Sequence, residues 1–269
     1  MRRLLTVVGL VSMLAWPAVA LAQAPAAPAQ GAPGQPGAGP APGERGGGQF
    51  PGRGRRGRGG PPQPANQPSP RDDARHQGFV EIAKAGNIDL LFVGDSITDW
   101  WARQGLEVWK ANFAALNPAN FGIAGDTTQG VLWRMQNGEL EGFKAKLIVL
   151  MLGTNNINRN PVDEIVDGNR LIVEEFKKRQ PQAKVLVLGV FPRTANAADP
   201  IRAIITEING KLAKLADNRQ VFFKDIGQAF LAPDGTLPAD VMPDGLHPNA
   251  KGYQIWADAI REDVKRLMQ

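Results

Sequence analysis

The chain of 269 residues contains no cysteine, one tyrosine and only two histidines, His76 and His247. Without cysteine the protein can form no disulfide, and it has neither a thiol nucleophile nor a thiolate metal site. It also has no His-Glu-x-x-His segment and no calcium-loop pattern. We therefore expect no metal and no other cofactor, and a reaction that needs an imidazole base has very few candidates.

Large apolar side chains are almost absent from residues 23–70, where Phe50 is the exception. Proline, glycine, alanine and glutamine dominate this stretch. Such a composition buries too little surface to offset the entropy that is lost on ordering. The sequence therefore predicts a disordered linker over residues 23–70. Its charged residues include the arginines Arg45, Arg53, Arg55, Arg56 and Arg58.

Residues 1–22 have the pattern of a secretory signal peptide. Two arginines precede an apolar run over residues 4–16 that is short for a membrane span, and residues 20–22 are typical of a cleavage site. We expect an exported protein, periplasmic or secreted. An N-terminal anchor that is not cleaved is the alternative interpretation.

The net charge of +5 comes from the first 70 residues, which hold seven arginines and one glutamate. Residues 71–269 therefore carry a net charge of −1, and they have the length of one domain with a full core. The arginine-glycine segment 52–60 resembles RNA-binding tails, but only Phe50 lies nearby for base stacking. Since export also argues against nucleic acid, weak contact with anionic cell-envelope polymers is the preferred interpretation.

Short apolar runs alternate with amphipathic segments along residues 71–269. The runs are apolar at consecutive positions, as in strands that helices cover on both faces. This alternation predicts an α/β fold with a parallel sheet, in which the active site lies beyond the carboxyl ends of the strands. The predicted strands are residues 88–93, 120–123, 147–152, 184–190 and 221–223, and the predicted helices are residues 71–85, 108–116, 129–136, 162–179, 201–215 and 249–268.

Polar clusters follow the ends of these strands or precede the last helix. Ser96 comes directly after the first strand, where a tight turn can expose its hydroxyl next to a base. On its own, Gly94-Asp95-Ser96 is more simply explained as a turn that caps a helix. His247 lies just before the final helix, where Asp244 can hold the imidazole and His247 can accept the serine proton. The alternative is a turn in which Pro248 opens that helix.

Acyl transfer also needs hydrogen-bond donors for the developing oxyanion. Gly125 follows the second strand and can offer its backbone amide, while Asn155 follows the third strand and can offer its side-chain amide. Each segment alone is more often a turn. Four such clusters in this order are hard to explain as turns.

The four segments resemble the four sequence blocks of the SGNH hydrolases, also called the GDSL esterase/lipase family. The serine of the first block falls on Ser96, the glycine of the second on Gly125 and the asparagine of the third on Asn155, and the Asp-x-x-His pair of the last block falls on Asp244 and His247. The chain is also similar to the catalytic subunits of intracellular platelet-activating-factor acetylhydrolase over roughly residues 71–268. That likeness rests on segments 120–128, 131–134, 137–141, 153–156 and 179–184.

The resemblance implies a flavodoxin-like, three-layer α/β/α sandwich and metal-free ester hydrolysis through an acyl-enzyme on Ser96. It assigns the oxyanion hole to the amides of Ser96 and Gly125 and the side chain of Asn155, and it assigns the proton transfers to His247. It further implies a small acyl group, with acetyl as the first choice. Because the acetylhydrolase subunits pair, a homodimer is also an option.

The chain departs from those subunits in ways that leave the alcohol part of the substrate open. Ile123-Ala124-Gly125 stands where the subunits have two adjacent glycines, and the pair of tryptophans after the serine turn has no counterpart there. Trp109 and Trp133 are expected to pack in the core or at its rim. The residues expected to line the substrate pocket are Asp95, Trp100, Trp101 and Asp126.

We therefore expect an exported serine esterase with residues 71–269 as its hydrolase domain. Its substrate is a small-molecule or polysaccharide acyl ester, and an O-acetylated carbohydrate is preferred for an exported protein of bacterial character. No long apolar lid segment is evident that would favour long-chain lipids. A lipid-directed acylhydrolase is one alternative. A non-catalytic glycan-binding domain of the same fold is the other, since a fold by itself does not imply a function.

Overall fold

The computed structural model describes residues 63–269. The predicted signal peptide and most of the predicted linker lie outside the described residues. Among the residues that the structure describes, no helix has both the length and the apolar character that crossing a membrane requires.

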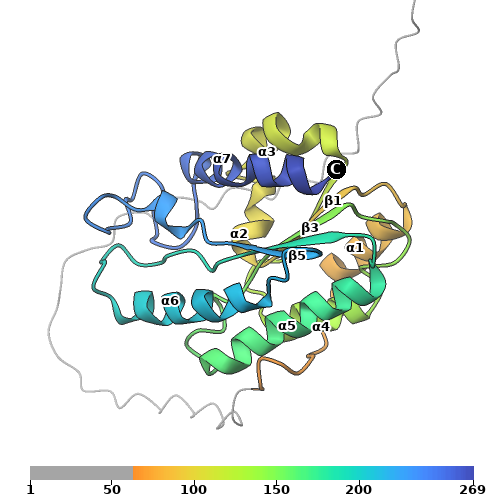
Figure 1. The fold of residues 1–269 in the computed structure, drawn as a ribbon, viewed down its shortest axis with the longest axis horizontal. Coiled ribbons are helices and arrows are strands. Elements are labelled where there is room, and N and C mark those ends of the chain that lie inside the picture. The colour runs from red at the N-terminus through yellow and green to blue at the C-terminus, as the bar shows by residue number, and fades with distance from the viewer. Residues whose placement is uncertain (1–62) are drawn as a thin grey trace, which may run out of the picture. The chain divides into compact units, whose positions relative to one another are not determined.

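A five-stranded sheet forms the centre of the domain, and its strand order is β2-β1-β3-β4-β5 (Figure 1). Every neighbouring pair of strands is parallel. The strands are β1 (Leu90–Gly94), β2 (Pro118–Gly122), β3 (Leu147–Met151), β4 (Lys184–Leu188) and β5 (Val221–Lys224).

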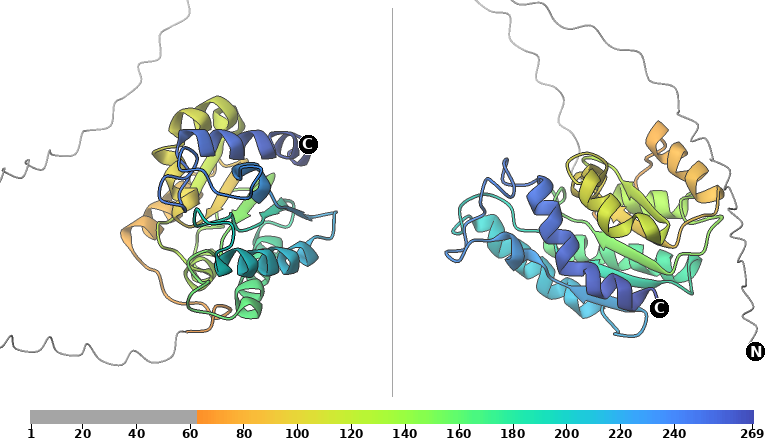
Figure 2. Two further views of the ribbon diagram at one scale, coloured as in Figure 1. Left: turned by 90° about the vertical axis from the view of Figure 1, so that its left-hand side faces the viewer. Right: turned by 90° about the horizontal axis from the view of Figure 1, so that it is seen from above.

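Helices cover both faces of this sheet. Figures 1 and 2 show α3 and α7 on one side and α4, α5 and α6 on the other. The expected three-layer α/β/α sandwich with a parallel sheet is therefore confirmed. The longer helices are α1 (Ala74–Lys84), α3 (Leu106–Phe113), α4 (Thr128–Gln136), α5 (Val162–Arg179), α6 (Pro200–Leu212) and α7 (Ala250–Leu267).

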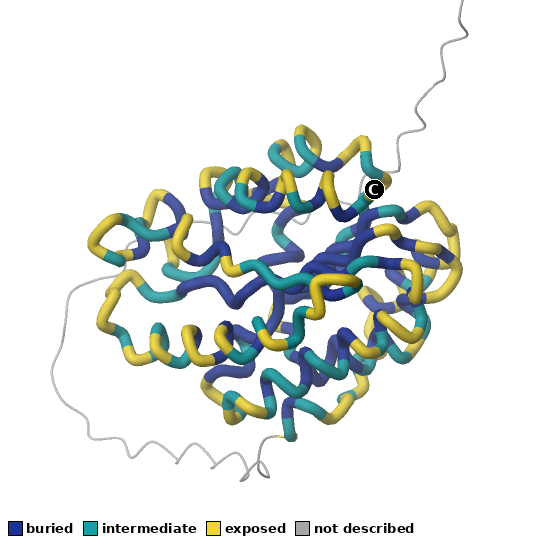
Figure 3. Tube along the Cα trace, in the orientation of Figure 1, coloured by how far each residue is buried: buried dark blue, intermediate teal, exposed yellow. Residues whose placement is uncertain are grey.

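The continuous apolar runs of the sequence serve two cores at once. In β1, Leu91 and Val93 pack into the core under α1, α4 and α5, while Leu90 and Phe92 pack into the core under α3 and α7. Successive side chains of a strand point to opposite faces, so a strand covered on both faces must be apolar at every position. The tube in Figure 3 shows this buried sheet between half-exposed helices.

The first helix starts later than the sequence predicts. Asp73 caps α1, because its side chain accepts hydrogen bonds from the amides of Arg75 and His76. The preceding residues therefore belong to the segment that enters the domain. Sequence patterns also missed the one-turn helix α2 (Ser96–Asp99), which begins directly after β1.

Residues 63–70 were predicted to be part of the disordered linker, and the structure corrects this boundary. Residues 63–71, called the N-terminal strap below, run along α4 and α5. Ala65 is fully buried, its carbonyl accepts a 2.6 Å hydrogen bond from the Thr128 hydroxyl, and its amide donates to Glu164 at 3.1 Å. These bonds use backbone groups, so a composition poor in apolar side chains does not prevent the strap from being ordered.

Candidate active site

Ser96 is the first residue of α2, which begins at the carboxyl end of β1, the strand between β2 and β3. Asp95 caps this helix, since its side chain accepts a 3.0 Å hydrogen bond from the Ile97 amide. A Cβ atom on Gly94 would lie 2.5 Å from the Met151 carbonyl oxygen, so the tight turn before the serine requires glycine. Ser96 is nearly buried, with 6% of its surface exposed. Its position directly after β1 puts the hydroxyl at the carboxyl edge of the sheet, where the active sites of such folds lie.

The structure brings Ser96, His247 and Asp244 into one hydrogen-bonded chain. Ser96 Oγ lies 2.9 Å from His247 Nε2, and His247 Nδ1 lies 2.6 Å from Asp244 Oδ2. With Nδ1 protonated towards the carboxylate, Nε2 is free to accept the serine proton. This is the arrangement of a nucleophile, a base and an orienting acid.

Asp244 is held in its ionised form. Burial opposes its ionisation, but hydrogen bonds from the His247 amide, the His247 ring and the Leu246 amide outweigh this effect and lower the pKa of Asp244. The two amide bonds measure 2.7 Å and 3.0 Å. A carboxylate fixed in this way can stabilise the imidazolium that forms when the serine is deprotonated.

The two adjacent tryptophans have different places. Trp100 stacks on the His247 ring, with 4.0 Å between ring centroids and an interplanar angle of 23°, so it borders the site as expected. Trp101 is fully buried in the core under α3 and α7, where it packs against Tyr253 and Trp256. The prediction that Trp101 lines the pocket is therefore wrong.

The two candidate oxyanion donors lie on neighbouring loops that contact each other. Gly125 is on an exposed loop and has φ of +76°, a conformation that favours glycine. The Asn155 side-chain nitrogen donates a 2.8 Å hydrogen bond to the Asp126 carbonyl. An amide nitrogen has two hydrogens, so this bond orients the side chain and leaves the second N–H for another acceptor.

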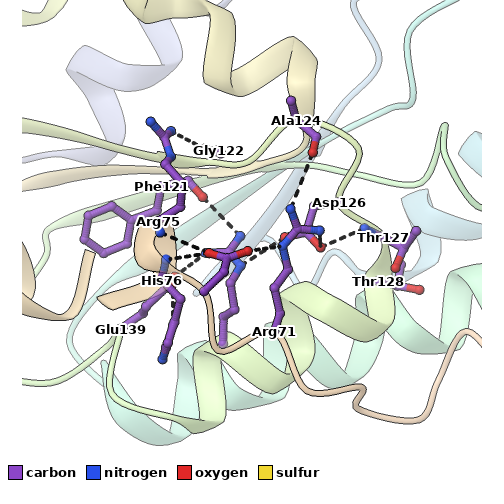
Figure 4. A network of polar contacts seen from close by, with 12 residues as sticks. Arg71, Arg75, His76, Phe121, Gly122, Ala124, Asp126, Thr127, Thr128 and Glu139 are labelled. Atoms are coloured by element: carbon purple, nitrogen blue, oxygen red, sulfur yellow. Dashed lines mark hydrogen bonds and ion pairs between the residues drawn. The ribbon is translucent and has the colours of Figure 1, made fainter. Parts of the chain in front are cut away.

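The Asp126 carboxylate points into the domain, so the prediction that Asp126 lines the pocket is wrong. It is 1% exposed and accepts hydrogen bonds from Arg134 Nε at 3.0 Å, from the Thr127 amide at 2.9 Å and from Arg71 at 3.3 Å. Figure 4 shows this network from the strap to Glu139. The carboxylate thus fixes the loop that carries Gly125.

Arg134 is the centre of the network. Its side chain is fully buried, it forms ion pairs with both Asp126 and Glu139, and it donates a 3.1 Å hydrogen bond to the Phe121 carbonyl. Burial works against its charge, but the two carboxylates dominate and raise the pKa of Arg134. His76, the other histidine of the chain, is buried with its Nδ1 2.9 Å from Glu139.

Asp95 is fully buried rather than exposed to a pocket, and this corrects its prediction as well. Burial, together with the nearby charge of Asp126, raises the pKa of Asp95 to about 7. Its Oδ2 atom makes no hydrogen bond with residues 63–269, which fits a carboxyl group that is easily protonated. The residue acts on the serine turn through its cap.

Two contacts of the site were not foreseen from the sequence. Arg134 interrupts an otherwise apolar helix face formed by Val131, Leu132 and Met135, and a charge in such a place is a sequence signal for a buried ion pair. The Tyr253 hydroxyl donates a 2.7 Å hydrogen bond to the Ile97 carbonyl, so α7 holds the residue after the serine. No sequence pattern indicated that bond.

Comparisons with known proteins agree with this geometry. A sequence model described as the GDSL-like Lipase/Acylhydrolase family matches residues 92–255. The chain is 40% identical over 200 residues to the platelet-activating factor acetylhydrolase IB subunit alpha2 of Homo sapiens, an alignment that covers 73% of this chain and 84% of that protein.

Solved structures share the fold at lower identity. A GDSL-like lipase of Bacteroides thetaiotaomicron superposes with a TM-score of 0.58 at 20% identity, over 71% of this chain and 97% of that one. An acetylxylan esterase of Geobacillus stearothermophilus superposes with a TM-score of 0.54 at 23% identity, over 69% and 96%. From the family match and the acetylhydrolase relatives, the chain belongs to the GDSL-like lipase/acylhydrolase family and is a carboxylic ester hydrolase.

Proposed function

We propose that this protein is an exported serine esterase that removes acetyl groups from carbohydrate esters. The observation that carries the mechanism is the chain of short contacts from Ser96 through His247 to Asp244. The likeness to acetylhydrolase subunits at 40% identity supports the acetyl group. The N-terminal signal pattern and the absence of a long apolar lid segment support an extracytoplasmic carbohydrate.

Ser96 Oγ attacks the ester carbonyl while its proton passes to His247 Nε2. The C–O bond to the alcohol then breaks, and His247 returns the proton to the leaving alcohol oxygen, which leaves an acetyl group on Ser96. Water attacks this acyl-enzyme with His247 again as base, and the bond to Ser96 Oγ breaks to release acetate. His247 donates the proton that it took from water to Ser96 Oγ as this bond breaks, which restores the free serine and the neutral imidazole.

Negative charge develops on the carbonyl oxygen in both steps. The Gly125 amide and the free N–H of Asn155 lie on the two loops next to the serine turn, and with the Ser96 amide they form the proposed oxyanion hole. Because such donors act on charge that exists only in the transition state, each contributes to kcat. Loss of one costs about 3 kcal/mol of transition-state stabilisation.

A lipid ester is the second candidate, because the similar curated proteins are named for platelet-activating factor. The same fold also occurs in an acetylxylan esterase, so the architecture is compatible with a carbohydrate alcohol. The two candidates differ in the alcohol and share the acetyl group. They are separated by testing substrates that differ only in that part.

The experiment measures hydrolysis of p-nitrophenyl acetate, butyrate and octanoate by the full chain, with Ser96→Ala and Asp244→Asn alongside. We expect acetate to be the fastest ester, Ser96→Ala to be inactive, and Asp244→Asn to lose about 10³- to 10⁴-fold in kcat because the imidazole tautomer is no longer fixed. Acetate release from acetylated xylan and from an sn-2 acetyl phospholipid then identifies the alcohol.

Equal rates for the wild type and Ser96→Ala on all three esters would contradict the nucleophile assignment. Release of acetate from the phospholipid but not from acetylated xylan would replace the carbohydrate by the lipid. Mass spectrometry of the protein recovered outside the cytoplasm tests export, and we expect its N-terminus at Gln23.

A further inference from the structure

A polar hollow of about 230 Å³ lies beside the proposed oxyanion loop. This polar hollow contains none of the residues that take part in acyl transfer. Each of its lining residues carries an amide, hydroxyl or guanidinium group, and apolar atoms line the rest. The lining residues are Gln63, Ser69, Thr127, Gln129, Arg159 and Asn160.

The polar hollow is next to both segments that carry the candidate oxyanion donors. Thr127 is two residues from Gly125, so their Cα atoms are at most about 7.6 Å apart. Asn160 belongs to the same loop as Asn155, between β3 and α5, and its amide donates a 2.9 Å hydrogen bond to the Asn156 carbonyl. The hollow therefore adjoins the two loops that carry the proposed oxyanion donors.

The walls of the hollow are fixed by hydrogen bonds to the N-terminal strap. The side chains of Gln129 and Asn160 both donate to the Gln63 carbonyl, at 2.9 Å and 3.0 Å. Asn156 donates a 2.8 Å hydrogen bond to the side-chain oxygen of Gln129. A site with oriented walls loses less entropy when it binds a ligand than a site that must first order its side chains.

Three polar side chains of the hollow are available to a ligand. Arg159 is exposed and forms no ion pair with the residues that the structure describes. The hydroxyls of Ser69 and Thr127 make no side-chain hydrogen bond within residues 63–269, and Thr127 does not cap α4 with its side chain. Together they offer a planar guanidinium with several donors and two hydroxyls that both donate and accept.

This combination matches hydroxyl groups on a sugar ring better than a phosphocholine headgroup or an alkyl chain. Sugar hydroxyls donate and accept at closely spaced positions, as the hollow does. The positive charge of Arg159 would repel a quaternary ammonium, and none of the lining residues of the hollow is aromatic, whereas such cations bind in aromatic cages. An alkyl chain would leave the polar walls without partners, which costs free energy.

We propose that the polar hollow binds the sugar next to the acetylated one, so that the substrate is an acetylated oligosaccharide or polysaccharide rather than a single acetylated sugar. The proposal rests on the proposed carbohydrate esterase function. Arg159, Thr127 and Ser69 are then binding residues for the carbohydrate and take no part in acyl transfer.

The test compares the full chain with Arg159→Met and Thr127→Val. Arg219→Met is the matched control, because Arg219 is an exposed arginine in the turn before β5, at the other end of the strands. Each protein is assayed on mono-acetylated xylotetraose and on p-nitrophenyl acetate. In a Ser96→Ala background, calorimetry measures the Kd of unmodified xylotetraose, so that binding is read without turnover.

For Arg159→Met and Thr127→Val we expect KM for the tetrasaccharide and Kd for xylotetraose to rise about five- to tenfold, the loss of one hydrogen bond to the ligand. Activity on p-nitrophenyl acetate should stay within twofold of the wild type. Arg219→Met should behave as the wild type on both substrates.

If the wild type deacetylates the tetrasaccharide and neither variant changes KM or Kd by more than twofold, the hollow is not a sugar subsite. An equal loss on both substrates would mean that the variants disturb the oxyanion loop, which also overturns the proposal. If the wild type cleaves p-nitrophenyl acetate but no acetylated sugar, the carbohydrate function itself fails, and this outcome is distinct from the other two.

Discussion

Replacing Arg134 by methionine should strongly lower the free energy of unfolding. The substitution keeps an unbranched chain of similar shape and removes the charge. Asp126 would keep Arg71 and the Thr127 amide, whereas within residues 63–269 Glu139 would keep only the His76 ring. Two carboxylates that are essentially inaccessible to solvent would then lack their shared cation.

Removing one partner of a buried ion pair costs about 3–5 kcal/mol, because the remaining charge is desolvated and uncompensated. Arg179 offers a matched control, since it also contacts two carboxylates and one carbonyl, but its side chain is 25% exposed. Solvent screens such a pair, so Arg179→Met should cost about 1 kcal/mol or less. The contrast between the two variants isolates the effect of burial.

Urea unfolding followed by circular dichroism measures both free energies, with the double variant Arg134→Met/Glu139→Gln beside them. We expect the double variant to regain part of the loss, because it no longer buries an uncompensated Glu139 charge. In the folded Arg134→Met protein, kcat for p-nitrophenyl acetate should fall more than KM rises, since the Gly125 loop is less well held. A loss of stability no larger than that of Arg179→Met would refute the reasoning.

Four further variants test other parts of the site. Asn155→Ala should lower kcat for p-nitrophenyl acetate about 10²- to 10³-fold with little change in KM, and a loss below fivefold would remove it from the oxyanion hole. Because the pKa of Asp95 is raised from its ordinary value of 3.8 to about 7, its contribution to stability is full below about pH 4 and is lost as pH rises through 7. Relative to wild type, Asp95→Asn should therefore gain stability in urea titrations as pH rises from 4 to 8, by an amount on the order of 4 kcal/mol, and parallel pH curves would contradict this. Trp101→Ala should cost about 3–5 kcal/mol of stability, whereas Trp100→Ala should cost less and change kcat, as unfolding and rate measurements on both variants will show.

The sequence predicted which clusters meet, because the carboxyl ends of parallel strands share one edge of a sheet. Ser96, Gly125 and Asn155 follow the strands β1, β2 and β3, which are neighbours in the order β2-β1-β3. Once the strands were recognised, the convergence of these residues followed from topology. To place Asp244 and His247 beside Ser96, Gly125 and Asn155, the sequence analysis needed only the position at which the last helix begins.

What the sequence could not give was the direction in which a polar side chain points from a loop. Asp95 and Asp126 flank the proposed donors, yet their carboxylates turn inward to an amide and to Arg134. Trp100 and Trp101 lie in a single turn of 3-10 helix, where adjacent side chains necessarily face different ways. Asp95 and Asp126 have partners two and eight residues away, so the sequence contained both the cap and the ion pair as alternatives to a place in the pocket. Trp101 instead packs against Tyr253 and Trp256 of α7, which no local pattern indicates.

The ordered conformation of the N-terminal strap was not predicted, for a related reason. Its partners Thr128 and Glu164 lie 63 and 99 positions from Ala65 along the chain. Composition measures how much apolar surface a segment can bury, and it does not register backbone groups that bond to a surface prepared elsewhere. A proline-rich segment can therefore be ordered wherever a folded domain offers donors and acceptors at the right spacing.

The nucleophile and the base are positioned by the same apolar core. His247 precedes α7, and Tyr253 on that helix donates to the carbonyl of Ile97, the residue after Ser96. Tyr253 also packs against Trp101 at 4.4 Å between ring centroids. A change in the packing of α7 would therefore move the serine turn and the histidine loop relative to each other. Such a displacement of the reacting groups reduces kcat without any change in a catalytic residue.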